Sequence, residues 1–578
     1  MKVILEYLKP YRLFVVLAPM FMVLEAGIEL LLPKIMTKMI EYGVGNGDIG
    51  YVAKMGTTMV LLSLVGIMGG VLCLACAAKV SQTVGRDLRK DLFTKIQSFS
   101  FRNIDTFQTP SLITRLTNDI TQIQMVILMS LRMLIRAPIL CFGSIIMAFT
   151  IDAKMAIIFV VAFALLMLVT AVIMKQAAPR FMRVQNKLDA VNTVMRECLA
   201  GIRVVKAFMR NEYEIEKFSN ANDEYKEASI GAFRLVLMIM PLMMIILNGS
   251  LVVILWVGGY AVDAGTLQVQ SIIAFNTYLI QMLMAVMMLA MVFLSMSRAK
   301  VSFERVLEIF AEEVDIQNPK NPVTAEGSDG SIVFENVSFS YGENSENSIL
   351  ENISFTIKGG ETIGILGETG SGKSTLVNLI PRLYDVTAGR ILVDGIDVKN
   401  QTLEELRKKV SVVLQETILF SGSIRSNIKW GNPDATDEEM YEAAKAAKAH
   451  EFIMGFPEGY DTHLGQRGVN VSGGQKQRIS IARALLQKPE IIIFDDSTSA
   501  VDAITEKNIR DSLQTAHKNT TKIIIAQRIA SVKDADQIIV LKDGKINAIG
   551  CHNVLMSTSE EYQAIFDSQT KKGVIFHE

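Results

Sequence analysis

Six long apolar runs in the first half of the chain constrain its fold more than any other feature. They cover roughly residues 14–35, 52–77, 126–150, 155–174, 235–260 and 272–296. As helices, these runs are long enough to cross a hydrocarbon core about 30 Å thick. Half of the 578 residues are hydrophobic, which is too many for an ordinary soluble protein. The sequence therefore predicts a multidomain membrane protein with a six-helix, all-α transmembrane domain over residues 1–310.

The connections between these runs alternate in length and charge. Those after the first, third and fifth runs are short, whereas those after the second and fourth are long and rich in Lys and Arg. Because basic loops stay on the cytoplasmic side, this bias predicts that both long loops and both chain ends are cytoplasmic. Helical spacing persists at residues 112–119 and 197–208, so we expect the helices to continue well beyond the membrane.

A second domain is predicted after a polar linker at residues 311–330, which contains Pro319, Pro322 and Gly327. Short β-rich runs then alternate with helices over residues 331–570, followed by a tail at 571–578. Several of these runs are continuously apolar, which is typical of a sheet buried between helices. We therefore expect an α/β domain here.

The α/β segment contains a complete phosphate-binding loop between a predicted strand (361–367) and a predicted helix (374–380). Backbone N–H groups of such a loop close on phosphates, its Lys reaches the β and γ phosphates, and its hydroxyl binds Mg²⁺. An apolar run then ends in Asp495, which is suited to hold the same ion. The predicted ATP-binding residues of this loop are Gly367, Glu368, Thr369, Gly370, Ser371, Gly372, Lys373, Ser374 and Thr375.

Further motifs restrict the class of P-loop protein. Val-Ser-Gly-Gly-Gln occupies residues 471–475, Gln415 closes a predicted strand, and Tyr341 precedes the P-loop. Ser-Ala-Val-Asp follows at residues 499–502. With these motifs the chain resembles ATP-binding-cassette (ABC) transporters over essentially its whole length. Six spans before one cassette resemble an exporter half-transporter, and in particular the degenerate-site subunit of bacterial heterodimeric multidrug exporters.

The resemblance implies a role for each motif. Tyr341 stacks on adenine, and Gln415 contacts Mg²⁺ and the γ-phosphate side. Two cassettes in this family sandwich two ATP molecules head to tail, so residues 472–475 serve the nucleotide of a second cassette. That segment consists of Ser472, Gly473, Gly474 and Gln475. Short coupling helices near residues 103–108 and 199–210 are implied to transmit cassette closure.

Two positions depart from the family pattern. Asp496 stands where the family uses a Glu as general base, and Gln527 stands where it uses a His. The Asp carboxylate is one methylene shorter, and a misplacement of about 1 Å can cost roughly 10²-fold in rate. Gln can donate a hydrogen bond but cannot carry the positive charge of a His. Together these changes predict an ATP site that binds Mg-ATP and hydrolyses it poorly.

We therefore predict a subunit of an ATP-driven heterodimeric exporter of amphipathic small molecules in a bacterial plasma membrane. A non-identical half-transporter with Glu and His at these positions forms the competent site, so hydrolysis occurs mainly there. Two alternatives stay open, namely a homodimeric lipid or peptide exporter and an ATP-gated channel. The net charge of −1 gives no support for nucleic-acid binding.

Four ionisable residues fall inside the apolar runs. Glu25 and Glu29 share one helix face, and so do Arg132 and Arg136. Such residues are costly at membrane depth, so they line a cavity or gate, pair with one another, or lie near a membrane surface. Cys73 and Cys76 have a C-x-x-C spacing within an apolar helical run, where we expect small packing residues.

Overall fold

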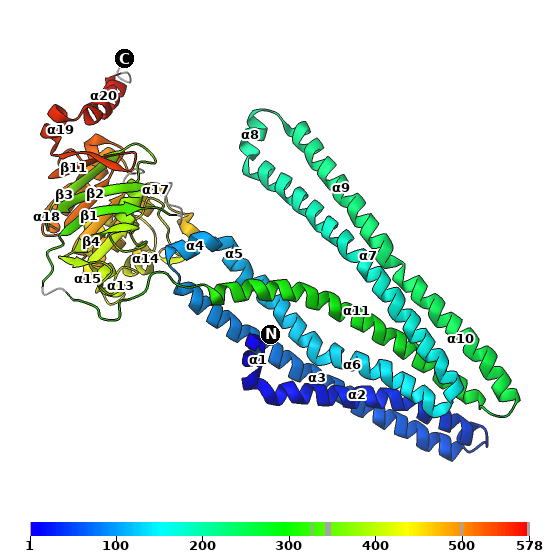
Figure 1. The fold of residues 1–578 in the computed structure, drawn as a ribbon. Helices are drawn as coiled ribbons and strands as arrows, with labels where there is room; N and C mark the ends of the chain where they lie inside the picture. The colour runs from blue at the N-terminus through cyan, green and yellow to red at the C-terminus, as the bar shows by residue number, and fades with distance from the viewer. Residues whose placement is uncertain (1, 325–326, 342–347, 498–500, 575–578) are drawn as a thin grey trace. The chain divides into compact units, whose positions relative to one another are not determined.

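The computed structural model describes residues 2–324, 327–341, 348–497 and 501–574. The chain folds into two compact units (Figure 1). The first unit comprises Met1–Gln97 and Thr109–Glu312, and the second comprises Ser98–Gln108 and Glu313–Glu578. The short segment Ser98–Gln108 lies within the range we assigned to the membrane domain, yet it groups with the second unit.

The first unit is built of long helices. Their bounds are α1 Lys2–Leu8, α2 Arg12–Lys38, α3 Ile49–Gln97, α5 Thr109–Thr114, α6 Ile120–Ile151, α7 Ala153–Ala200, α8 Ile202–Ala207, α9 Asn211–Leu237, α10 Ile239–Asp263 and α11 Val269–Ala311. A 3-10 turn, Lys9–Tyr11, joins α1 to α2, while π-helical turns occupy Met39–Val44 and Arg115–Asp119.

Six helical segments among the described residues are long and apolar enough to cross a membrane, which confirms the predicted number of spans. Helix α3 has 49 residues and α7 has 48. At about 1.5 Å per residue each is roughly 70 Å long, more than twice the thickness of a hydrocarbon core. The expected continuation of these helices beyond the membrane is therefore confirmed.

Small residues bring α2 and α3 close together. Gly66, Gly69, Cys73 and Ala77 of α3 are buried, and a Cβ added to Gly69 would lie 3.2 Å from the carbonyl oxygen of Phe21. Close backbone approach of this kind is how small residues pack membrane helices. The exposed fraction of Cys73 is 0%, so this residue serves as a small packing side chain.

Three of the four membrane charges form one ion-pair cluster. Arg136 of α6 donates from Nη1 to Glu25 Oε1 at 2.6 Å and from Nη2 to Glu29 Oε2 at 2.8 Å. Of the alternatives that the sequence left open, mutual pairing is the one seen for these residues. Arg132, one turn away, has no ion pair among the described residues, and its Nε is buried without a hydrogen-bond partner there.

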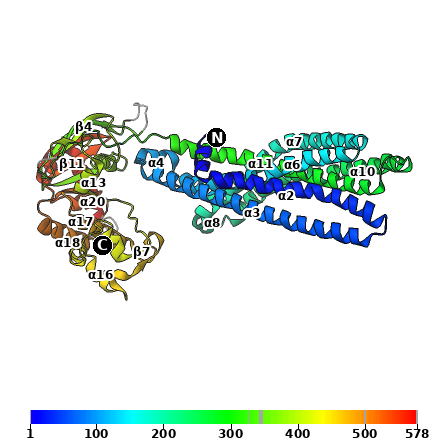
Figure 2. The same ribbon diagram turned by 90° about the horizontal axis from the view of Figure 1, so that it is seen from below.

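Within the first unit, α2, α3, α6 and α11 lie side by side (Figure 2). Helices α7 and α9 run alongside each other and are joined by α8 at their far end (Figure 1). Helix α9 packs mainly against α7, α8 and α10. Many apolar side chains of this hairpin remain exposed, including Leu199, Val204, Phe208 and Met209.

The second unit is an α/β fold with two main sheets. The six-stranded sheet has the order β12-β11-β3-β10-β9-β6, and the four-stranded sheet has the order β2-β1-β4-β5. The strands are β1 Ile332–Phe339, β2 Leu350–Ile357, β3 Thr362–Gly367, β4 Ala388–Val393, β5 Ile396–Asp397, β6 Val410–Val413, β7 Gly422–Ser423, β8 His463–Leu464, β9 Ile491–Asp495, β10 Thr521–Ile525, β11 Gln537–Lys542 and β12 Lys545–Gly550.

Helices surround these sheets. They are α4 Phe101–Phe107, α12 Lys373–Asn378, α13 Leu403–Lys409, α14 Ile424–Lys429, α15 Asp437–Ala446, α16 His450–Met454, α17 Gly473–Leu486, α18 Ala503–Ala516, α19 His552–Thr558 and α20 Glu560–Val574. Strands β6, β9, β10, β3 and β11 pair in parallel. Their apolar residues are buried in cores on both faces, as expected for a parallel sheet between helices. The predicted α/β domain is confirmed.

Helix α4 is held within the second unit by polar contacts. Ser100 and Asn103 form a capping box at its start. Asn103 Nδ2 donates to the carbonyl oxygen of Glu313 at 3.1 Å, and the hydroxyl of Tyr384 donates to Asp105 Oδ2 at 2.7 Å. The ring of Phe101 also lies 6.0 Å from that of Tyr384. This segment, which the sequence assigned to the membrane domain, is therefore part of the second unit.

Candidate nucleotide-binding site

The P-loop connects β3 to α12, as the motif predicted. Gly372 caps α12 with φ of 96°, a left-handed conformation that favours glycine. A Cβ on Gly372 would also lie 2.8 Å from Leu350 Cδ2. The neighbouring Gly370, with φ of 88°, has no atom within 4 Å of an added Cβ. The loop is thus closely packed at Gly372 and open at Gly370, where phosphates could approach its N–H groups.

The side chain of Lys373 lies within the P-loop. Its Nζ donates to the carbonyl oxygens of Gly367 at 3.0 Å and Glu368 at 2.6 Å. Burial lowers the pKa of Lys373 below its ordinary value, and the nearby carboxylates of Asp495 and Asp496 oppose that shift. An ammonium group held by backbone carbonyls in a half-buried cradle is suited to an anionic ligand.

Ser374 and Asp495 form a second polar pair beside the loop. Ser374 Oγ donates to Asp495 Oδ1 at 2.8 Å, although 121 residues separate them in sequence. Asp495 ends the buried strand β9, and burial raises the pKa of its carboxyl above the ordinary value. One hydroxyl and one carboxylate in contact are hard oxygen ligands, and the donor set therefore fits Mg²⁺.

Asp496 is the next residue and is held from two sides. Its Oδ2 accepts hydrogen bonds from Gln527 Nε2 at 3.0 Å and from Gln415 Nε2 at 3.4 Å. The backbone of Asp496 has φ of 45°, a left-handed conformation that is uncommon outside glycine and marks local strain. Burial raises the pKa of this carboxyl above its ordinary value.

These groups line one cavity of about 320 Å³. The structure brings together ten of the predicted site residues here, namely Thr369, Gly370, Gly372, Lys373, Ser374, Thr375, Gln415, Asp495, Asp496 and Gln527. Ile349 and Ile525 also line the cavity and were not predicted, because single apolar residues at strand ends carry no sequence signal. Tyr341 reaches the edge of the site, where its hydroxyl lies 3.2 Å from that of Thr375.

A further tyrosine at this edge was not predicted from the sequence. The ring of Tyr384 lies 5.1 Å from that of Tyr341 in an edge-on arrangement, and its hydroxyl binds Asp105. It therefore touches both the tyrosine at the edge of the site and helix α4. No motif marks Tyr384 in the sequence, and only the fold brings these groups together.

The predicted signature segment lies outside this cavity. Ser472 caps α17, and Gln475 completes a capping box with it. The first N–H groups of a helix have no partners within it, so this helix start is suited to a phosphate. Of the motif at residues 499–502, Ser499 and Ala500 fall outside the described residues, while Asp502 accepts from Thr505 N at 2.9 Å and caps α18.

Six membrane-spanning segments and a P-loop domain define a nucleotide-dependent membrane protein. Family comparison narrows this class: the family described as ABC transporter transmembrane region matches residues 15–286, and the ABC transporter family matches residues 350–499. The chain is 42% identical to YfiB of Bacillus subtilis, an uncharacterized ABC transporter ATP-binding protein, over 98% of each chain. The chain belongs to the ABC transporter family.

Two further comparisons agree. The chain is 33% identical to YgaD of Bacillus subtilis, described as a candidate multidrug export ATP-binding/permease protein, over 98% of this chain and 99% of that protein. It also matches the structure of a bacterial Atm1-family ABC exporter with ATP bound, with a TM-score of 0.80 and 26% identity over 96% and 98% of the two chains. The protein is a multi-pass ABC exporter, and its cassette is an ATPase domain that drives transport.

Proposed function

We propose that this chain is the degenerate-site subunit of a heterodimeric exporter in a bacterial plasma membrane. In this proposal its cassette and both termini are cytoplasmic, and its cargo is an amphipathic small molecule. The chain retains Mg-ATP at its own P-loop, and an unlike partner with Glu and His carries out most of the hydrolysis. The single observation that carries the proposal is the contact between Asp496 and Gln527 beside the P-loop cradle.

The chemical groups in the contact between Asp496 and Gln527 support poor ATP hydrolysis at this site. A general base must reach the proton of the attacking water, and the carboxylate of Asp496 instead accepts from the amides of Gln527 and Gln415. Neither amide can take up or carry positive charge, so the site lacks the charged group that a His would supply. The side chains that bind phosphate and metal, by contrast, are all present.

We assign nucleotide and metal binding to the remaining cavity residues. Lys373 and the loop N–H groups would hold the phosphates, and Ser374 and Asp495 would hold Mg²⁺ with help from Gln415. Tyr341, 43% exposed, would offer its ring to adenine. Bound Mg²⁺ would neutralise phosphate charge, which favours retention of the nucleotide at this site.

The intact helix start at Ser472 supports a division of labour. Its capping box occupies the N–H of Gln475 and leaves those of Gly473 and Gly474 without a capping partner among the described residues, and this cassette's own P-loop cavity does not include the segment. In the proposal, Ser472, Gly473, Gly474 and Gln475 complete the competent site on the partner's nucleotide. A chain with an impaired ATP site and a complete signature segment can support hydrolysis only at the partner's nucleotide, which favours two different subunits.

Uncovered apolar surface in both units also supports a partner chain. In the cassette, Phe420 stacks on Trp430 at 4.6 Å beside a groove of about 520 Å³, and Trp430 is 64% exposed. In the first unit, Phe208 and Met209 near α8 are 74% and 85% exposed. Apolar patches of this kind outside the bilayer mark protein contacts. We assign them to the second half-transporter.

Native mass measurement of the purified chain, alone and after co-expression with a candidate partner, tests the proposal. The candidate is a half-transporter that carries Glu and His at the positions equivalent to Asp496 and Gln527. We expect a one-to-one complex to form in preference to a self-dimer. A stable self-dimer that transports cargo without the second chain would contradict the proposal and favour a homodimeric exporter.

A further inference from the structure

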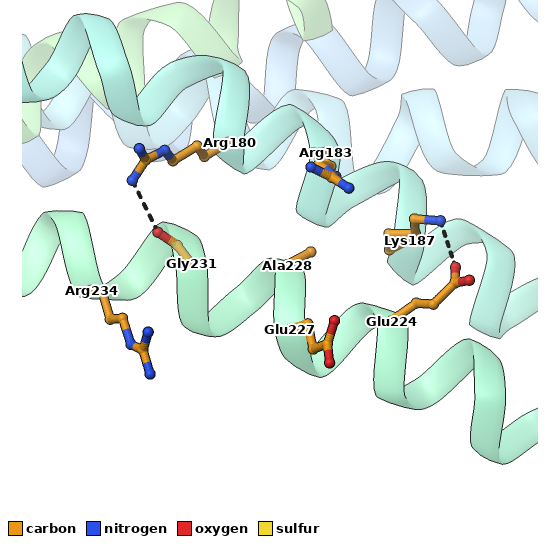
Figure 3. Close-up of a pocket in the computed structure, with 8 residues that line it drawn as sticks. All are labelled: Arg180, Arg183, Lys187, Glu224, Glu227, Ala228, Gly231 and Arg234. Atoms are coloured by element: carbon orange, nitrogen blue, oxygen red, sulfur yellow. Dashed lines mark hydrogen bonds and ion pairs between the residues drawn. The ribbon is translucent and has the colours of Figure 1, made fainter.

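A basic groove runs between α7 and α9 on the part of the hairpin nearest the membrane. It has a volume of about 700 Å³ and is lined by Arg180, Arg183, Lys187, Glu224, Glu227, Ala228, Gly231 and Arg234 (Figure 3). Four basic and two acidic side chains therefore line the groove. This excess of positive charge lies far in sequence from the P-loop and has no role in the ATPase site.

Some of the basic side chains in the groove are not neutralised by contacts within it. Lys187 pairs with Glu224 at 2.5 Å, and Arg180 Nη1 donates to the carbonyl oxygen of Gly231 at 3.3 Å (Figure 3). Within the described part of the chain Arg183 and Arg234 make no hydrogen bond or ion pair, although the charge of Arg183 adds to that of Lys187 in lowering the pKa of Glu224 (Figure 3). Two guanidinium groups are thus available to an anion.

The groove begins at the cytoplasmic edge predicted for the bilayer. The fourth apolar run ends near residue 174, which places Arg180 about 9 Å and Arg183 about 14 Å beyond it along the helix. The fifth run begins near residue 235, directly after Arg234. The headgroup layer is roughly 5–8 Å thick on each side, so Arg234 lies within it, whereas Arg180 and Arg183 lie beyond it and reach back toward it through their long side chains.

Exposed apolar side chains adjoin two of the lining arginines in sequence. Phe181 of α7 and Phe233 of α9 are in edge-to-face contact, with ring centroids 5.9 Å apart. They are 38% and 54% exposed, and Leu237, one turn closer to the membrane, is 69% exposed. The apolar chain of a ligand whose anionic head binds in the groove would therefore find exposed apolar side chains on the same two helices.

We propose that this groove binds the phosphate of an anionic phospholipid from the cytoplasmic leaflet. Guanidinium groups match phosphate oxygens in pairs of hydrogen bonds, and basic pockets between helices on this side of a membrane bind lipid headgroups. The exposed aromatic and leucine side chains favour a lipid over a soluble phosphate. This site does not depend on the heterodimer or on the state of the ATP site.

The test measures retention of phosphatidylglycerol by the full-length protein, against phosphatidylcholine, using native mass spectrometry after extraction from mixed bilayers. The variant Arg183→Gln/Arg234→Gln removes the two uncommitted charges and leaves the Lys187–Glu224 and Arg180–Gly231 contacts intact. The matched control is Arg196→Gln/Arg203→Gln, because both residues are exposed and lie outside the groove. A third variant, Gly231→Glu, adds a carboxylate where an added side chain has open space.

We expect the groove variant to bind phosphatidylglycerol roughly tenfold to thirtyfold more weakly, with phosphatidylcholine retention unchanged and the control like wild type. Gly231→Glu should weaken binding in the same direction. Equal phosphatidylglycerol retention by wild type and both groove variants would overturn the proposed site. An equal loss in the control variant would also overturn it, because binding would then depend on overall charge and not on the groove. If millimolar inorganic phosphate displaces the lipid from wild type, the phosphate site stands and the lipid source is overturned.

Discussion

Gln527 donates from Nε2 to Asp496 Oδ2 at 3.0 Å, so the two residues that depart from the ABC pattern are in direct contact. The contact joins the loop after β10 to the end of β9, two parallel neighbours in the central sheet. The Gln527 amide holds the Asp496 carboxylate in place by a hydrogen bond. Unlike a His, an amide can neither accept a proton nor carry a positive charge. The two substitutions therefore form one structural unit rather than two separate changes.

Restoring both residues should restore hydrolysis at this site. We expect Asp496→Glu/Gln527→His to raise single-turnover hydrolysis by about 10²-fold or more, because a positioned general base contributes roughly 10²–10⁴-fold. The measurement uses the heterodimer with the partner's catalytic Glu replaced by Gln, so that only this site can react. Either single change should give a much smaller gain, and a double variant as slow as wild type would count against poor hydrolysis arising from these two residues.

Neutralising the native carboxylate should matter little. Asp496→Asn is expected to change transport by the complex less than about twofold, since Asp496 already serves as a hydrogen-bond acceptor for two amides. Replacing the partner's catalytic Glu by Gln should reduce transport by about 10²-fold or more. Transport assays in sealed vesicles compare the two directly, and equal losses would argue against asymmetric sites.

Acid should weaken Mg²⁺-dependent ATP binding earlier than an ordinary aspartate would. Burial raises the pKa of Asp495, so this carboxyl takes up a proton at a higher pH than an exposed Asp. A protonated carboxyl is a poor metal ligand, and affinity should therefore fall as the pH drops toward that raised pKa. Nucleotide binding measured across pH with and without Mg²⁺ tests this, and in Asp495→Asn the metal-dependent part should be weaker and no longer change through this pH range.

The hydroxyl of Tyr384 should couple the nucleotide site to helix α4. Tyr384→Phe keeps the ring contacts with Tyr341 and Phe101 and removes the hydrogen bond to Asp105. A hydrogen bond to a charged group contributes roughly 1.5–3 kcal/mol. We expect ATP affinity to stay near wild type while cargo stimulation of ATPase activity falls several-fold. Unchanged stimulation would show that the hydroxyl only stabilises the loop.

Breaking the membrane ion-pair cluster should destabilise the first unit. Arg136→Leu leaves Glu25 and Glu29, which are partly buried, without their shared partner, and two uncompensated carboxylates at membrane depth are costly. Thermal unfolding in detergent should show a clear drop. The control Arg132→Leu, one turn away and without an ion pair among the described residues, should change stability much less. Adding Glu25→Gln and Glu29→Gln to Arg136→Leu should recover part of the loss.

Local patterns were sufficient to predict the spans and the P-loop cavity. An apolar run of about 20 residues and a Gly-rich loop ending in Lys373-Ser374 each carry their physical meaning within one stretch of sequence. Contacts between distant segments could not be predicted in this way. Tyr384 and Asp105 are 279 residues apart, and the choice of Arg136 over Arg132 as partner for both glutamates depends on how α2 and α6 are rotated.

Asymmetric hydrolysis is tested most directly by the steady-state ATPase rate of the purified chain, alone and with its partner. We predict that the chain alone binds ATP through the cradle around Lys373 yet hydrolyses it slowly. Addition of the Glu- and His-bearing half-transporter should raise turnover by about 10²-fold or more. Fast, cargo-stimulated hydrolysis by the chain alone would contradict the degenerate-site proposal.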